Sequence, residues 1–147
     1  MHTRLLASLV ITLVAVFNGC PTASGAGVKI TGIQYDPPGV DTHRNSSLNK
    51  EFVVLKNTGN ATVTLTGLRL EDKGEYHVYT FDTFRLGAGE TVTIHTGFGN
   101  DDRNDLYWKW GFGDIWGNDA DTATLELRYG NRVDQCHYSG GGKAVNC

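Results

Sequence analysis

The sequence predicts an all-β domain, and three observations carry this prediction. Short runs rich in β-branched and aromatic residues recur, no long stretch has the helical period, and clusters of Gly, Asn and Asp separate the runs. The length of 147 residues fits one domain. About seven short strands with such spacing indicate two sheets packed face to face, although a barrel has the same spacing.

Each expected strand is bounded by turn-forming residues. Strands are expected at residues 28–35, 51–57, 62–70, 76–81, 91–96, 122–129 and 132–138, and residues 106–110 form either another strand or a packed loop. Residues that accept positive φ occupy the turns at 72–74, 87–89 and 130–131. Such residues close hairpins between neighbouring strands.

The apolar pattern assigns faces to three of these strands. In strand 122–129, one face carries Ala123, Leu125, Leu127 and Tyr129. Strand 51–57 is apolar on both faces, which indicates a central strand that is covered on both sides. In strand 62–70 the apolar phase changes across Gly67, as expected for a β-bulge.

The N-terminal segment has the pattern of a secretory signal. A short basic start that ends at Arg4 precedes an uncharged stretch over residues 5–17. This stretch is shorter than the ~20 residues that span a membrane. Residues 1–26 are therefore expected to be a signal peptide, and residues 27–147 to form the mature domain.

Two ends of this signal are compatible with the sequence. Small residues around Gly25 and Ala26 suit ordinary signal peptidase. Alternatively, Gly19-Cys20 is similar to the end of a lipobox, so that the signal ends at residue 19 and Cys20 is lipidated. The expected location is secreted, or anchored at the cell membrane through Cys20.

A disulfide is expected between the two cysteines that follow the signal. Cys136 and Cys147 form an even pair in an oxidising compartment. Their bond would attach the C-terminal tail to the last strand. No His or Cys partner lies at ligand spacing to indicate a metal site instead.

Composition and motifs argue against catalysis and against nucleic-acid binding. A formal net charge of −3 does not provide the clustered Lys and Arg that phosphate contacts need. Nucleophile-elbow, phosphate-loop, dinucleotide and zinc-protease motifs are all missing from the sequence. His95 is interpreted as an exposed sheet residue rather than a base. We expect no catalytic residues and no cofactor.

Two oxygen-rich loops are the one indication of a metal. Calcium binds about six to eight oxygens of carboxylates and carbonyls. Neither loop matches the EF-hand spacing, however, and Asn/Asp clusters are ordinary turn formers. The low-ranking calcium candidates are Asp101, Asp102, Asp105, Asp119 and Asp121.

The two loops flank an aromatic segment, for which the sequence allows two interpretations. Tyr107, Trp108, Trp110 and Trp116, together with Phe112, could form an exposed binding face able to stack on sugars. The alternative is a packed aromatic cluster between the sheets.

Ordered motifs carry a family resemblance. They are IQYDPPG (33–39) with NKEFV (49–53), TVTIHTG (91–97), IWGN (115–118) with DTATL (121–125), and VDQCHY (133–138). Together they resemble the lamin tail domain family in its secreted, actinobacterial-like form. The resemblance implies an immunoglobulin-like β-sandwich of about seven to nine strands, without shared catalytic residues, that acts as a binding or attachment module.

Three functions follow from these expectations. The favoured one is a non-catalytic, exported module that binds an unknown cell-envelope or extracellular ligand and meets the membrane only through its signal or lipid anchor. The alternative is a calcium-stabilised structural protein of the envelope. A small sandwich-fold hydrolase is the third and least favoured.

Overall fold

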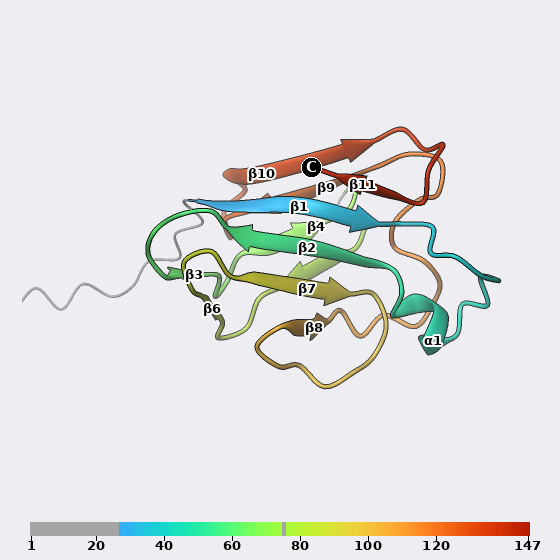
Figure 1. Cartoon of the computed structure of the whole chain (residues 1–147), viewed down its shortest axis with the longest axis horizontal. Coiled ribbons are helices and arrows are strands. Elements are labelled where there is room, and N and C mark those ends of the chain that lie inside the picture. The colour runs from blue at the N-terminus through green and yellow to red at the C-terminus, as the bar shows by residue number, and fades with distance from the viewer. Residues whose placement is uncertain (1–26, 75) are drawn as a thin grey trace, which may run out of the picture.

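Two β-sheets face each other across the hydrophobic core (Figure 1). The computed structural model describes residues 27–74 and 76–147. The predicted signal over residues 1–26, with Cys20, lies outside the described residues. Over the described ranges, no helix has the length and apolar character needed to cross a membrane.

The larger sheet has five strands in the order β11-β1-β2-β7-β8. Its neighbours pair antiparallel, except that β7 and β8 are parallel. A one-turn helix, α1 (Asn45–Leu48), lies at one end of this sheet (Figure 1). The strands are β1 (Val28–Gln34), β2 (Phe52–Asn57), β7 (Thr91–His95), β8 (Asp105–Tyr107) and β11 (Ala144–Asn146).

The second sheet has four strands in the order β10-β9-β4-β5. They are β4 (Arg69–Glu71), β5 (Val78–Thr80), β9 (Asp121–Glu126) and β10 (Arg132–Tyr138). A separate two-stranded sheet pairs β3 (Val63–Thr64) with β6 (Arg85–Leu86). The two main sheets form the immunoglobulin-like sandwich that the sequence predicts.

The core forms because alternate residues of the facing strands point inward. Val53 and Leu55 of β2 and Leu125 of β9 are completely buried. Each such aliphatic side chain contributes about 1.5–3 kcal/mol through removal from water. The β9–β10 hairpin turns at Gly130, where a φ of +85° suits glycine.

The predicted strand 62–70 is wrong as a single bulged strand. Its first part is β3, which pairs with β6, and its last part is β4, which pairs with β9 and β5. Gly67 lies in the turn between them with a φ of +80°. The apolar phase changes because the chain moves from one sheet to another.

Strand 122–129 is shorter than predicted. β9 ends at Glu126, and a turn over residues 127–130 follows. Ala123 and Leu125 face the core as expected, but Tyr129 is 88% exposed. The assignment of Tyr129 to the inward face is wrong because the alternation stops where the strand does.

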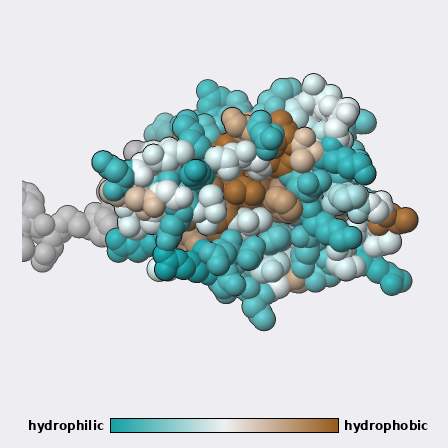
Figure 2. All heavy atoms as spheres, in the orientation of Figure 1, coloured by the Kyte–Doolittle hydropathy of each residue, from teal (hydrophilic) through white to brown (hydrophobic). Residues whose placement is uncertain are grey.

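Strand β2 is central, as predicted, because β1 and β7 pair with its two edges. Its outer face is only partly covered, since Phe52 and Val54 remain half-buried. With Val145 of β11 they line a shallow groove on the sheet. Figure 2 shows apolar atoms gathered near the centre of this face within a hydrophilic surround.

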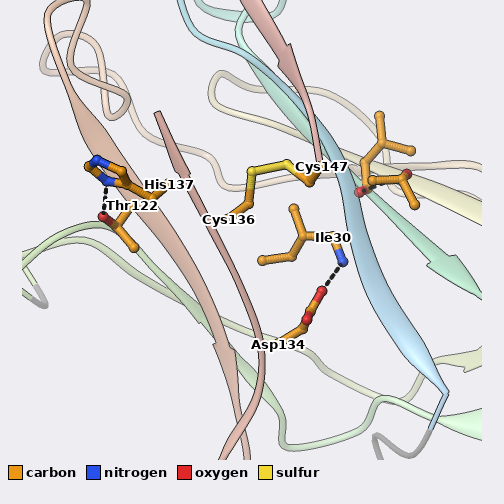
Figure 3. The surroundings of a disulfide bond; sticks show 8 residues. Ile30, Thr122, Asp134, Cys136, His137 and Cys147 are labelled. Atoms are coloured by element: carbon orange, nitrogen blue, oxygen red, sulfur yellow. Dashed lines mark hydrogen bonds between the residues drawn. A yellow bond between two sulfur atoms is a disulfide. The ribbon is translucent and has the colours of Figure 1, made fainter. Parts of the chain in front are cut away.

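The predicted disulfide between Cys136 and Cys147 is present and joins the two sheets (Figure 3). Cys136 belongs to β10, and Cys147 directly follows β11, which pairs with β1. Beside the disulfide, Asp134 of β10 bonds to Ile30 of β1 (Figure 3). The edge formed by β1, β10 and β11 is therefore closed covalently and by hydrogen bonding.

Candidate binding surface at the α1 end

The structure divides the predicted aromatic binding face between core and surface. Trp116 is 1% exposed and belongs to the core, so its place in an exposed face is wrong. Trp108 is half-buried and packs edge-on against Trp116, with ring centroids 6.0 Å apart. For these two tryptophans the second interpretation, a packed cluster, is correct.

Tyr107 stacks on His95 of the neighbouring strand, with ring centroids 5.0 Å apart. His95 is not the exposed residue predicted, because 17% of its side chain is accessible. Its Nδ1 lies 2.8 Å from the Asn49 carbonyl and its Nε2 lies 2.8 Å from the Asp105 carboxylate. Both ring nitrogens therefore lie at hydrogen-bond distance from oxygen atoms of the fold.

The accessible aromatic groups lie further along the same loop and beside it. Trp110 is half-buried and packs edge-on against Phe112, whose side chain is 89% exposed. Phe98 is 51% exposed, and its ring lies over Gly111. Phe112 belongs to the predicted aromatic platform, whereas Phe98 was not among the predicted binding residues. We call Phe98, Trp110 and Phe112 the aromatic tips.

Two asparagines of the α1 region fix the backbone that carries Phe98. The Phe98 carbonyl accepts N–H bonds from Asn45 and Asn49, each at 2.9 Å. The Phe98 amide donates to Asn45 Oδ1. Phe98 therefore extends from a backbone anchored to the α1 region.

Glu51 holds the loop that carries Phe112 through hydrogen bonds to its backbone. Its buried carboxylate accepts the backbone N–H groups of Trp116 at 2.8 Å and Ile115 at 3.2 Å. Burial raises the pKa of Glu51 to about 8 against these hydrogen bonds, and the charge of Asp114 raises it further. This carboxyl group joins the start of β2 to the loop that carries Phe112.

Three ionisable groups come together next to the aromatic tips. His43 Nδ1 lies 3.6 Å from Asp41 Oδ1 and 3.5 Å from Asp114 Oδ2. Burial and the neighbouring Asp41 raise the pKa of Asp114 to about 6, and a hydrogen bond from Asp114 lowers the pKa of Asp41. Asp114 therefore keeps its proton, in a hydrogen bond with Asp41, up to a higher pH than an isolated aspartic acid does.

The same three residues have the donor types that divalent cations use. One ligand atom from each of Asp41, His43 and Asp114 lies within 4.8 Å of the other two. Among residues 27–74 and 76–147, the fold brings together one group of three or more residues that could hold a metal ion, and it is this one. None of its members belongs to the five predicted calcium ligands.

The first calcium candidates instead stabilise the 99–105 loop. Asp101 accepts the Tyr107 N–H at 2.9 Å and pairs with Lys109 at 2.8 Å. Asp102 accepts the N–H groups of the two residues that begin the return to β8, and these hydrogen bonds lower its pKa. Asp105 pairs with His95. These carboxylates act as turn and ion-pair partners.

The second calcium loop has a similar structural role. Asp121 is buried and accepts backbone N–H bonds from Lys73, Gly117 and Thr122. Asp119 is exposed, next to the turn at Gly140. The prediction of turn-forming Asn and Asp describes both loops better than the prediction of a calcium site.

The α1-end groupings were not identified from the sequence. Asp41 and Asp114 lie far apart in the chain, and each occurs in a loop without a recognisable ligand spacing. A partial signal was available for Glu51, because an acidic residue directly before an apolar strand requires a buried partner. Two of its partners are backbone amides, which leave no pattern in the sequence.

Comparisons with known proteins agree with this architecture. The family model described as Lamin Tail Domain matches residues 21–140, which is most of the chain. The comparison with curated proteins found no match to this chain. The family is one of non-enzymatic, immunoglobulin-like domains, in agreement with the two-sheet sandwich. The chain belongs to the lamin tail domain family.

Proposed function

We propose that this protein is an exported, non-catalytic binding module that attaches to a cell-envelope or extracellular ligand through the aromatic tips. The observation that carries the proposal is the exposure of Phe112 and Phe98 on loops that are anchored by Glu51, Asn45 and Asn49. Exposed apolar groups rimmed by polar residues are typical of interaction sites.

The chemistry around the aromatic tips favours an uncharged or cationic ligand. Asp41 and Asp114 add carboxylates beside the tips. A nucleic acid would meet these groups without the clustered cations that it requires. Polysaccharide and protein surfaces of the envelope are the ligand classes that fit aromatic contacts with acidic neighbours.

Export is tested by the intact mass of the full chain made in an exporting bacterial host. A lipid-free mass that starts near Gly27 indicates a released protein, and an acylated mass that starts at Cys20 indicates a membrane-anchored one. Cys20→Ser should remove acylation in the second case only. Retention of residues 1–26 in the cytoplasm would contradict the proposal.

Binding is tested by co-sedimentation of the mature protein with purified bacterial cell walls. Phe112→Ala and Phe98→Ser should each reduce the bound fraction several-fold. Tyr129→Ala is the matched control, because Tyr129 is as exposed as Phe112 but lies in the β9–β10 turn. Equal sedimentation of all variants, or loss in the control alone, would exclude the aromatic tips as the binding surface.

A further inference from the structure

A small cavity of about 260 Å³ lies where β5, the segment after it, β8 and the 99–105 loop meet. Its walls are apolar and aromatic. Phe81 and Leu106 are buried at its base, and Tyr79 and Phe84 are half-buried at its sides. The residues that line it are distinct from the aromatic tips.

Neighbouring rings stabilise one wall of this cavity. Tyr79 packs edge-on against Phe81, with centroids 4.9 Å apart and an interplanar angle of 86°. On another side it contacts Trp108 at 5.6 Å. Because these contacts fix the Tyr79 ring, the cavity requires little rearrangement to accept a ligand.

Carboxylates form the rim, and the lining contains no Lys, Arg or His. Asp101 is paired with Lys109, and Asp102 accepts backbone N–H groups through one oxygen. Asp82 is exposed and has no ion-pair or hydrogen-bond partner within the described part of the chain. The rim therefore carries negative charge that the fold does not neutralise.

The negative charge of the rim affects the pKa of Tyr79, which lines the cavity. Burial, followed by the negative charges of Asp101 and Asp82, raises the pKa of Tyr79 to about 12. Carboxylates from two separate segments thus act on the same aromatic wall.

We propose that this cavity binds an alkylammonium group, such as the end of a lysine side chain or a choline-type quaternary ammonium. Aromatic rings attract organic cations through their quadrupoles, and apolar walls contact the alkyl carbons. The volume is below the ~300–1,000 Å³ of drug-sized sites, which suits a small headgroup or one side chain. Calcium fits less well, because Phe81, Phe84 and Leu106 supply no oxygen ligands.

The proposal goes beyond cell-wall attachment and is tested separately. The mature protein is titrated with choline and with n-butylammonium by ¹⁵N NMR, with amide shifts followed at Thr83 and Leu106. The neutral isostere 3,3-dimethyl-1-butanol has the shape of choline without its charge. At least one cation should bind several-fold tighter than the isostere, and the tighter cation identifies a quaternary or a lysine-type source. Failure of both cations to bind more tightly than the isostere, or shifts with CaCl₂ alone, would overturn the proposal.

Two variants locate the site. Asp82→Asn should weaken cation binding about 2- to 5-fold through loss of an exposed ion pair. Phe84→Leu retains an apolar wall but removes a ring, and should weaken binding about 2- to 30-fold. Asp119→Asn is the matched exposed control and should bind as the parent does. Parent-like binding by both Asp82→Asn and Phe84→Leu, with dispersed spectra that confirm folding, would exclude this cavity.

Discussion

The carboxylate of Asp134, in β10, accepts the backbone N–H of Ile30, in β1, at 2.8 Å. β1 has an irregularity between Ile30 and Gly32, and β11 pairs with β1 only from Gly32 onward. The Ile30 amide therefore has no strand partner on that side. A side chain from the opposite sheet completes its hydrogen bonding, and Lys29 pairs with the same carboxylate at 3.0 Å.

Asp134→Ala should destabilise the fold by about 1–3 kcal/mol, because it leaves the buried Ile30 N–H without an acceptor. The measurement is urea unfolding followed by tryptophan fluorescence. Lys29→Ala is the control. It removes only an exposed ion pair and should cost less than about 1 kcal/mol. Equal losses in the two variants would assign the effect to the ion pair instead.

Removal of the disulfide should weaken the edge that it closes. Cys136 and Cys147 lie 11 positions apart in the chain, and loops of about this size contribute roughly 3 kcal/mol when cross-linked. The double variant Cys136→Ala/Cys147→Ala should lose about that much stability. Hydrogen exchange should rise most at β11. Unchanged protection of β11 would mean that its pairing with β1 suffices.

The raised pKa of Glu51 predicts that the protein becomes less stable as the pH rises. Its pKa is 4.5 when unfolded and about 8 in the fold. Below pH 4.5 both states are protonated, and between these values the unfolded chain loses a proton that the folded chain keeps. The free energy of unfolding should fall by up to about 1.4 kcal/mol per pH unit across this window.

Glu51→Gln isolates this contribution, because glutamine resembles the protonated side chain and does not titrate. Thermal melts of both proteins from pH 4 to 9 provide the comparison. The parent should lose stability more steeply than the variant as the pH rises toward 8. Parallel profiles would show that Glu51 ionises in the fold without penalty.

Calcium should not stabilise the protein through the loops that the sequence suggested. Asp101, Asp102 and Asp121 already accept backbone or Lys109 hydrogen bonds. Melting curves in CaCl₂ and in EDTA are expected to overlay. A stabilisation by calcium that Asp101→Asn abolishes would restore the original candidates. One that only Asp114→Asn abolishes would assign it to the Asp41–His43–Asp114 set.

Local pattern was sufficient to predict most of the sandwich. The β9–β10 hairpin depends on alternation within ten or so residues and on Gly130, both of which are visible in the sequence. The disulfide followed from an even cysteine pair. These features require no knowledge of which segments meet in space.

The division of residues 62–70 shows where local pattern fails. A phase change at Gly67 has the same appearance for a bulge and for a move between sheets. The choice depends on β6 and β9, which pair with the two halves and lie later in the chain. Only the partners distinguish the two structures.

The candidate surface was predicted less well for the same reason. Aromatic residues marked the right loop, but spacing did not separate buried Trp116 from exposed Phe112. The Asp41–His43–Asp114 set joins two loops that are remote in sequence. Only the folded chain brings their ligand atoms together.

β1 pairs with β11, and the ribosome synthesises these two strands at very different times. Translation produces β1 first, whereas the strand that covers its edge emerges only after nearly all the remaining described residues. In that interval the edge of β1 presents unpaired amides and carbonyls to other molecules. A ribosome that stops before residue 144 would release a product whose first strand is open to intermolecular association.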